Sequence, residues 1–576
     1  MRFYAFARAA AIGSLTVGAA CGRSTARRDA SVRGPGLYAE RLALDPERFR
    51  RHVEELSSDR YEGRGPGTRG EDLTISYLVR HLQEAGLEPG APGGSYVQDV
   101  PLRVLRYNAA ASFRGSSRTV TLAAPRDFSP FSQDASTVAL DSAPVIFAGY
   151  GIAAPEYGWD DYAGADVRGA VVLVLEGDPP AADPREPSKL DERRFDGARP
   201  SPYASRTSKF RTARARGAAA AFVVHETGVS PAPFEALANA WSQGRMTLAT
   251  SAPTSPDTTR PPVFGYISQA GAAALFDAAG QQLDSARAAA GKDGFRAVRL
   301  TGTAALRVAA TARPLLTRNV VAKRTGSDSL GRDEYVLFTA HWDHLGRDST
   351  RAGDQIFNGA MDNAGGVAQL LEIARAFARF PRAPRRTVVF VATAAEEFGL
   401  LGARHYVRNP LYPLANTVAV LNLDWFTAWG RTRDVVNISA GHTTLDQVLA
   451  DAAAAQGRVV VPDPAPDQLY FERSDHFPFA ESGVPSLFAG AGLTYVGRPA
   501  DYGPKRDSIY MDRDYHRVSD EVRPDWDYTG AVEDAALWIA VGRSLADSRD
   551  WPEWTAATRY PEFRARRDST RAQSRR

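Results

Sequence analysis

Hydrophobic and polar positions follow helical spacing in the first part of the chain. Apolar residues recur at that spacing in 45–58 and again in 70–87, where Leu78 and Leu82 share one face. The segment 59–70 between them is rich in glycine and predicts a loop. These patterns predict two amphipathic helices joined by a glycine-rich loop.

The pattern changes over residues 100–310, where short apolar runs alternate with turn residues. Four runs, "APVIFAGYGI", "AVVLVLEGDPP", "AAAFVVHE" and "PVFGYIS", predict strands. The segment 208–221 predicts a helix that leads into one of them. His225 is alone among these elements, so we interpret it as a structural residue. We expect a β-rich unit with no catalytic cluster of its own.

Residues 312–545 alternate between apolar strands and amphipathic helices. Continuous apolar runs predict strands in 333–343, 385–397 and 416–425, and the segment 363–380 predicts a helix. Strands without polar alternation, separated by helices, are typical of a parallel sheet covered on both faces. The expected fold class is therefore α/β, with a doubly wound and mostly parallel sheet.

Composition is that of an ordinary globular protein. The 576 residues are 44% hydrophobic and 24% charged, with a net charge of +3. This length suggests about two to four domains. The small net charge gives no reason to expect nucleic acid as a partner.

The N-terminal residues predict export. Arg2 and Arg8 give the first eight residues a positive charge. The apolar or small segment 9–20 follows and ends at Cys21. This order is typical of a signal peptide, here residues 1–20, and it is too short to span a bilayer. Cys21 is the only cysteine, so disulfides within the chain are excluded. We interpret Cys21 as a lipid anchor of a cell-envelope lipoprotein; a plain secretory signal with an incidental cysteine is the alternative. Residues 21–44 would then form a flexible tether.

Histidine and carboxylate residues follow three of the predicted strands. The first strand ends in "AHWD", the second in "AAEE" and the third in "NLD". Asp362 adds a fourth group from the glycine-rich segment "NGAMDNAGG". Because open α/β sheets bind ligands at the carboxyl ends of their strands, we expect these groups to meet at one edge.

Several carboxylates at one edge would repel one another unless a cation neutralised them. Histidine together with carboxylate suits zinc, and such mixed sites can hold two metal ions. The adjacent Glu396 and Glu397 can divide the work, with one binding metal and the other acting as a base. A second histidine ligand is needed, and composition alone leaves His442, His476 and His516 as candidates.

Five segments in order resemble the co-catalytic di-zinc aminopeptidases, of the leucyl or bacterial aminopeptidase type. They are "AHWDH", "GAMDNAGG", "ATAAEEFGLLGARHY", "LNLDW" and "YHRVSDE". The segment 145–180 resembles the opening of a protease-associated domain inserted into such a peptidase. The resemblance implies a peptidase domain in two parts, 45–125 and 305–548, with a protease-associated domain, 126–304, inserted between them. Residues 549–576 are polar and rich in arginine, so we interpret them as a solvated C-terminal tail that is partly packed by its aromatics.

The resemblance implies two Zn²⁺ ions per chain. His341 and Asp424 would hold one zinc, Glu397 and His516 would hold the other, and Asp362 would bridge both.

Three further residues receive roles from the same resemblance. Glu396 would be the general base, Asp343 would orient His341 from behind, and Tyr515 would help to stabilise the oxyanion. Alternate positions on a strand share a side, so His341 and Asp343 can support one another, whereas His344 faces elsewhere and is not expected to be a ligand.

Neighbouring residues shape the expected substrate pocket. Asp475 and His476 are expected to form a wall of it and not to bind metal. Trp425 stands where the family often has a smaller or sulfur-containing residue, which would reshape the pocket.

The resemblance implies an exported aminopeptidase with a peptide as its substrate and partner. Membrane contact would come only through Cys21, and the sequence predicts no particular oligomeric state. Alternatives are a carboxypeptidase of the same family, with Arg473 binding the substrate carboxylate, a mono-zinc glutaminyl cyclase and a non-catalytic binding protein. A phosphatase-like hydrolase is not favoured, because the chain has no phosphate-binding loop.

Overall fold

The computed structural model describes residues 44–574 except 134, 184, 187, 198, 228, 231–232 and 250–259. The expected signal peptide, Cys21 and the tether up to residue 43 lie outside the described residues. Of the helices that are described, none has an apolar stretch long enough to cross a membrane.

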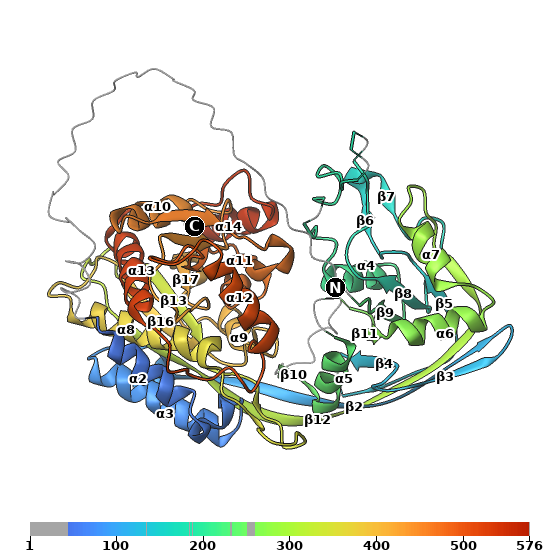
Figure 1. Cartoon of the computed structure of the whole chain (residues 1–576), viewed down its shortest axis with the longest axis horizontal. Helices are drawn as coiled ribbons and strands as arrows, with labels where there is room; N and C mark the ends of the chain where they lie inside the picture. The colour runs from blue at the N-terminus through green and yellow to red at the C-terminus, as the bar shows by residue number, and fades with distance from the viewer. Residues whose placement is uncertain are drawn as a thin grey trace.

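The chain forms two lobes that share two long strands (Figure 1). We call residues 44–96 and 325–574 the main lobe and residues 116–297 the insert lobe. The shared strands are β2 (Val97–Gly115) and β12 (Val298–Arg324).

Helices of the main lobe come from both ends of the sequence. They are α2 (Pro46–Leu56), α3 (Arg69–Glu84), α8 (Gly366–Arg379), α9 (Leu401–Arg408), α10 (Leu445–Ala455), α11 (His476–Glu481), α12 (Tyr502–Arg513), α13 (Thr529–Asp547) and α14 (Pro561–Ser574). Its strands are β1 (Glu88–Pro89), β13 (Tyr335–His341), β14 (Gly346–Arg347), β15 (Ile356–Phe357), β16 (Thr387–Thr393), β17 (Thr417–Asn422), β18 (Asp434–Asn437), β19 (Val459–Pro462) and β20 (Ser486–Ala491).

The central sheet of the main lobe runs β19-β18-β20-β17-β13-β16-β12. β13 pairs in parallel with both β16 and β17, and β17 pairs in parallel with β20. The pairs β12–β16 and β18–β20 are antiparallel. The sheet is therefore mostly parallel at its centre, as the continuous apolar runs predicted.

Alternate residues of the central strands enter two different cores. Val336 and Phe338 of β13 pack in the core that includes α8 and α13. Leu337 points to the other face, where Ala403 of α9 and Phe479 of α11 are buried. Helices thus cover both faces of the sheet, which confirms the doubly wound α/β fold.

The insert lobe continues the same sheet, because β5 (Thr137–Phe147) pairs with β12, and it adds helices of its own. Its strands are β3 (Thr119–Ala123), β4 (Phe128–Ser132), β5 (Thr137–Phe147), β6 (Ala153–Ala154), β7 (Trp159–Asp160), β8 (Val171–Leu175), β9 (Ala220–Val224), β10 (Arg245–Leu248) and β11 (Val263–Ile267). Its helices are α4 (Arg206–Ala215), α5 (Phe234–Gln243), α6 (Gln269–Ala278) and α7 (Leu283–Ala290). The four apolar runs of the sequence form β5, β8, β9 and β11, which pair in parallel in that order.

The C-terminal segment 549–574 packs against the main lobe and ends in helix α14. Trp554, Tyr560 and Phe563 are buried in a cluster with Phe471 and Phe488. The aromatics are therefore packed, as expected, and they fix a helical segment where the sequence alone suggested a solvated tail.

Candidate metal centre

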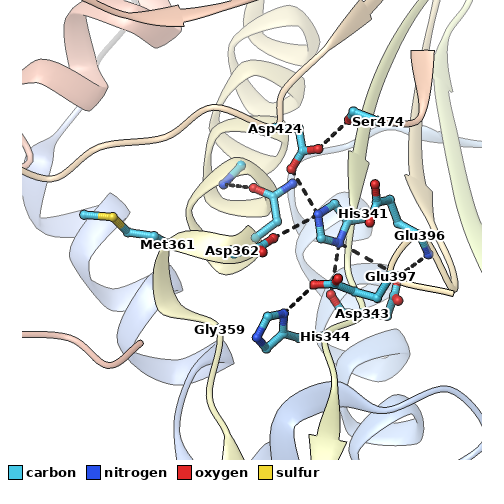
Figure 2. A network of polar contacts seen from close by, with 12 residues as sticks. His341, Asp343, His344, Gly359, Met361, Asp362, Glu396, Glu397, Asp424 and Ser474 are labelled. Carbon is cyan, nitrogen blue, oxygen red and sulfur yellow. Dashed lines mark hydrogen bonds and ion pairs between the residues drawn. The ribbon is translucent and has the colours of Figure 1, made fainter. Parts of the chain in front are cut away.

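The strand ends bring the predicted groups together at one edge of the sheet (Figure 2). His341 is the last residue of β13, which lies between β16 and β17. Glu396 and Glu397 follow β16, and Asp424 follows β17. Because the three strands are parallel, their carboxyl ends meet and deliver these side chains to one place.

Asp362 lies between two imidazoles. Its Oδ1 is 3.2 Å from His341 Nε2, and its Oδ2 is 3.1 Å from His516 Nε2. Asp362 comes from the turn at Ala360–Gly365 before α8, and His516 follows α12. Each carboxylate oxygen of Asp362 therefore faces a different histidine.

A second carboxylate contacts each of these histidines. Asp424 Oδ1 is 3.0 Å from His341 Nε2, and Glu397 Oε2 is 3.0 Å from His516 Nε2. Asp424 also accepts a hydrogen bond from the Ser474 hydroxyl, which sequence reasoning missed. The five residues that the resemblance proposed as metal ligands are therefore gathered into one cluster.

His341 is held by Asp343 in the way that a metal-binding histidine usually is. Its Nδ1 lies 3.0 Å from the backbone carbonyl of Asp343, so Nδ1 donates and Nε2 faces the carboxylates. The Asp343 carboxylate is 3.9 Å from the same nitrogen and accepts from the backbone N–H of Glu396 at 3.0 Å. Burial raises the pKa of Asp343 to about 8.

His344 is the main departure from expectation at this site. It does not face away: its Nδ1 is 2.6 Å from Glu397 Oε1, and the ring is fully buried. One atom each from His344, Asp362 and Glu397 lie within 4.8 Å of one another. The cause is that the chain leaves β13 after His341, so strand alternation does not extend to position 344.

Glu396 lines the same cavity, and within the described part of the chain no ion pair joins its side chain to a cation. The backbone at Ala395 has a positive φ of 53°, which turns the chain sharply before the two glutamates. Burial raises the pKa of Glu396 well above its usual value, and the carboxylates of Asp424 and Glu397 add to this effect. His341 acts in the opposite direction but does not outweigh them. A carboxyl with a raised pKa is suited to accept and return a proton.

Neighbouring carboxylates raise the pKa values of both imidazoles of this cluster. Burial alone would lower the pKa of His341, but Asp424 and Glu396 raise it well above the usual value. Burial would likewise lower the pKa of His516, but Glu397 and Asp362 outweigh burial and raise this pKa to about 10. The same contacts hold the pKa of Asp362 well below its usual range, although burial acts in the opposite direction.

These charges fit a divalent cation. Four carboxylates, Asp362, Glu396, Glu397 and Asp424, converge on two imidazoles, which even when protonated cannot balance four ionised carboxylates. Metal ions replace protons on such groups, and mixed oxygen and nitrogen donors suit first-row divalent metals.

Two residues behind the cluster were not predicted. Asp520 accepts hydrogen bonds from the backbone N–H groups of Met361 and Asp362, each at 3.1 Å. The buried Arg64 guanidinium donates to the carbonyl of Trp342 and to that of Gly359, at 2.9 and 2.8 Å. Burial lowers the pKa of Arg64 to about 10 despite its nearby carboxylates.

Tyr515 packs directly on a histidine of the cluster. Its ring stacks on that of His516 with centroids 3.9 Å apart, and its hydroxyl accepts from Arg473 at 3.3 Å. Both Tyr515 and Arg473 line the cavity that opens onto the cluster.

The cavity has a volume of about 110 Å³ and a largely aromatic wall. Trp425, Phe426, Trp429, Tyr470, Phe488 and Tyr510 line it beside the cluster. Trp425 is thus a wall residue, in line with its expected influence on the pocket.

The expected wall residues Asp475 and His476 are not at the cavity surface. Both are fully buried, and Asp475 accepts a hydrogen bond from Thr393 beneath the sheet edge. His476 packs against Phe471 and Phe488, with His442 in the same aromatic cluster. That prediction was wrong, because α11 begins at His476 and turns these side chains into the core, leaving Arg473 and Ser474 at the cavity.

Comparison with known proteins agrees with this geometry. Residues 319–540 match the family model described as peptidase family M28. A probable zinc metalloprotease of Pyrenophora teres is 40% identical over 112 residues, which cover 19% of this chain and 23% of that protein. The probable lipoprotein aminopeptidase LpqL of Mycobacterium tuberculosis is 28% identical over 250 residues, 39% of this chain and 45% of that protein. The chain thus spans less than half the length of these relatives.

A solved structure shows the same fold. The aminopeptidase from Aneurinibacillus sp. strain AM-1 superposes with a TM-score of 0.50 at 17% identity, covering 89% of this chain and 96% of that one. At this identity the likeness concerns the fold alone. Over residues 319–540 the chain matches peptidase family M28, which confirms the resemblance carried by the order of its site motifs.

Proposed function

We propose that this chain is an exported zinc aminopeptidase, a hydrolase that removes residues from the N-termini of peptides. The observation that carries the proposal is Asp362, whose two oxygens lie 3.2 and 3.1 Å from the imidazoles of His341 and His516. A carboxylate shared in this way suits a bridge between two metal ions. The M28 match and the names of the relatives support zinc and an aminopeptidase.

The donors divide into two sets around that bridge. His341 and Asp424 would hold one zinc, Glu397 and His516 would hold the other, and Asp362 would belong to both. His344 contacts Glu397 and would orient it, in the way that groups behind a metal ligand usually do.

When bound, the zinc pair would supply Lewis acidity, which lowers the pKa of a water and polarises a peptide carbonyl. Glu396 takes the proton of the attacking water and passes it to the leaving amine. Tyr515 lines the cavity, and its hydroxyl would donate to the oxygen that gains charge. Asp343 holds the Nδ1–H of His341 and so keeps Nε2 toward the cluster.

The proposal assigns the free α-amine of the substrate to the carboxylates of the centre. A second candidate, a carboxypeptidase, is favoured by one observation: Arg473 reaches the cavity beside Tyr515 and could bind a substrate carboxylate. The two activities differ in which end of the peptide must be free.

One mixed peptide in three forms separates these candidates. The free, N-acetylated and C-amidated forms are incubated with the chain lacking residues 1–21, and mass spectrometry follows the products. We expect stepwise loss of N-terminal residues from the free and amidated forms. Loss of C-terminal residues from the acetylated form would instead establish the carboxypeptidase.

Glu396→Gln tests the proposed base. The substitution keeps size and removes the proton acceptor, so turnover should fall by about 100-fold or more while two zinc ions per chain remain. Metal content is measured by mass spectrometry alongside kcat. Glu176→Gln removes a buried glutamate of the insert lobe and should leave turnover unchanged. Full activity of a metal-replete Glu396→Gln would contradict the assignment.

We further propose that the insert lobe is a protease-associated domain and that residues 1–21 direct export and lipidation. The four parallel strands of the insert lobe and the name of the lipoprotein relative support these two proposals. Labelling of cells with a radioactive or alkyne fatty acid tests the second, with Cys21→Ser as the control.

A further inference from the structure

Asp507 is a carboxylate in the cavity that the proposed chemistry does not use. It lies on α12 (Tyr502–Arg513), and Tyr510 and Met511 on the same helix also line the cavity. Residues three and four positions apart share one face of a helix, with about 5–6 Å between their Cβ atoms. Asp507 is therefore one helical turn from Tyr510, whose hydroxyl contacts Asp520 at 3.4 Å behind the metal centre.

No residue in the described part of the chain forms a hydrogen bond or ion pair with the Asp507 carboxylate. Its neighbour Arg506 is turned away and pairs with Asp525 at 2.9 Å. Burial raises the pKa of Asp507, and no cation acts against that effect. A half-buried carboxylate without a partner is unfavourable unless a ligand supplies the positive charge.

The rest of the cavity wall suits the stem of a long cationic side chain. Its aromatic rings include Trp425, Trp429 and Tyr470. Such faces pack against methylene groups and attract ammonium and guanidinium groups. Among the described lining residues Arg473 is the one arginine, and lysine is absent; Arg473 sits over Tyr470 and beside Tyr515. Repulsion from Arg473 would direct a positive charge toward Asp507.

We propose that Asp507 makes this cavity selective for peptides whose N-terminal residue is lysine or arginine. The proposal rests on the aminopeptidase function proposed above. In this arrangement the α-amine lies at the metal centre, the aromatic wall covers the side-chain stem and the charged end meets the Asp507 carboxylate.

The first test compares N-terminal residues on one peptide with the zinc-loaded chain. Lysine and arginine are compared with norleucine and methionine, which match the length of the lysine stem without its charge. We expect kcat/KM to be about 10–100-fold higher for the cationic residues, the range of a charge-assisted contact. Equal or faster release of norleucine would overturn the proposed selectivity and would still be consistent with an aminopeptidase. No N-terminal release from any peptide would instead refute the function itself.

The second test replaces the carboxylate. Asp507→Asn should lower kcat/KM for lysine by about 10–100-fold and leave norleucine nearly unchanged. Asp512→Asn, an exposed aspartate on the same helix, should leave both values unchanged. Retained activity on norleucine shows that the variant is folded, and an unchanged preference for lysine in it would overturn the assignment.

A third measurement does not depend on turnover. Isothermal titration of the zinc-loaded chain with free lysine and with norleucine, the two reaction products, should show tighter binding of lysine that Asp507→Asn abolishes. Equal affinity for both products in the unsubstituted chain would contradict the proposal.

Discussion

Arg64 shows how much of this site depends on one buried side chain. Its guanidinium donates to four backbone carbonyls, those of Leu56, Trp342, Asn358 and Gly359. Two of these carbonyls belong to residues that adjoin the cluster, one next to His341 and one in the turn before Asp362. Gly63 permits this approach, because a Cβ there would lie 2.4 Å from the Gly346 carbonyl and its φ is +67°.

Arg64→Met should therefore damage both stability and catalysis. Four buried carbonyls lose their donor and nearby carboxylates lose a cation, so the free energy of unfolding should fall by about 3–5 kcal/mol. Displacement of the backbone beside His341 should lower kcat/KM by about 100-fold. Urea unfolding and steady-state kinetics measure the two effects.

The matched control is Arg386, which is also fully buried and donates to the carbonyls of Leu545, Asp550 and Arg549 away from the metal centre. Arg386→Met should lose stability but keep kcat/KM. If Arg64→Met keeps its kcat/KM too, Arg64 has only a structural role.

The residues at the strand ends could be predicted from the sequence, but the residues that hold them in place could not. His341, Glu396 and Asp424 could be placed because parallel strands end at the same edge. His516 could not be chosen over His442 or His476 from composition, since each follows a loop whose path depends on tertiary packing. Arg64, Ser474 and Asp520 left no signal in the sequence, because they act through backbone groups or single hydrogen bonds to residues far away in the chain.

At the scale of elements, the C-terminal segment supports the wall of the cavity. The loop that contains the short 3-10 helix Tyr470–Glu472 carries Tyr470 at the cavity and precedes Arg473. Behind it, Phe471 stacks on Tyr560 with ring centroids 5.4 Å apart, and the Tyr560 hydroxyl donates to Glu472. The segment 549–574 thus fixes a loop that forms one side of the substrate cavity.

Tyr560→Phe should loosen that loop without removing the stacking. Loss of the hydrogen bond to Glu472 should raise KM by roughly 2–10-fold with little change in kcat, because binding and not chemistry uses the loop. Tyr203→Phe removes the same kind of bond, to Glu156 in the insert lobe, and should leave KM unchanged. A similar rise in KM in both variants would argue against a role for the C-terminal segment.

At the scale of the whole molecule, the two lobes have separate hydrophobic cores. Phe377 and Phe338 belong to the core of the main lobe, whereas Phe276 and Phe147 belong to that of the insert lobe. The residues of the candidate metal centre all lie in the main lobe. Removal of metal by a chelator should therefore lower the stability of the main lobe and not that of the insert lobe.

Calorimetry with and without a chelator tests this separation. Loss of metal leaves the carboxylates of the centre unbalanced, so the unfolding temperature of the main lobe should fall by about 5 °C or more. The transition of the insert lobe should stay in place. Phe377→Ala and Phe276→Ala, each expected to remove about 3–5 kcal/mol, identify the two transitions. A shift of both on chelation would show that the lobes unfold as one unit.

The shared strands β2 and β12 have a consequence for biosynthesis. Their ladder runs from the pair Gly302–Gly115 to the pair Val320–Val97, so its two halves are separated by the entire insert lobe. At a synthesis rate of about 5–20 residues per second, β2 can pair early with β3 and β10 but must wait roughly 10–40 s for β12 to be made. Meanwhile the insert lobe, whose strands are contiguous in sequence, can fold first and hold the growing chain apart. The side of nascent β2 that later pairs with β12 is the exposed edge that a chaperone or an export factor would have to cover during that interval.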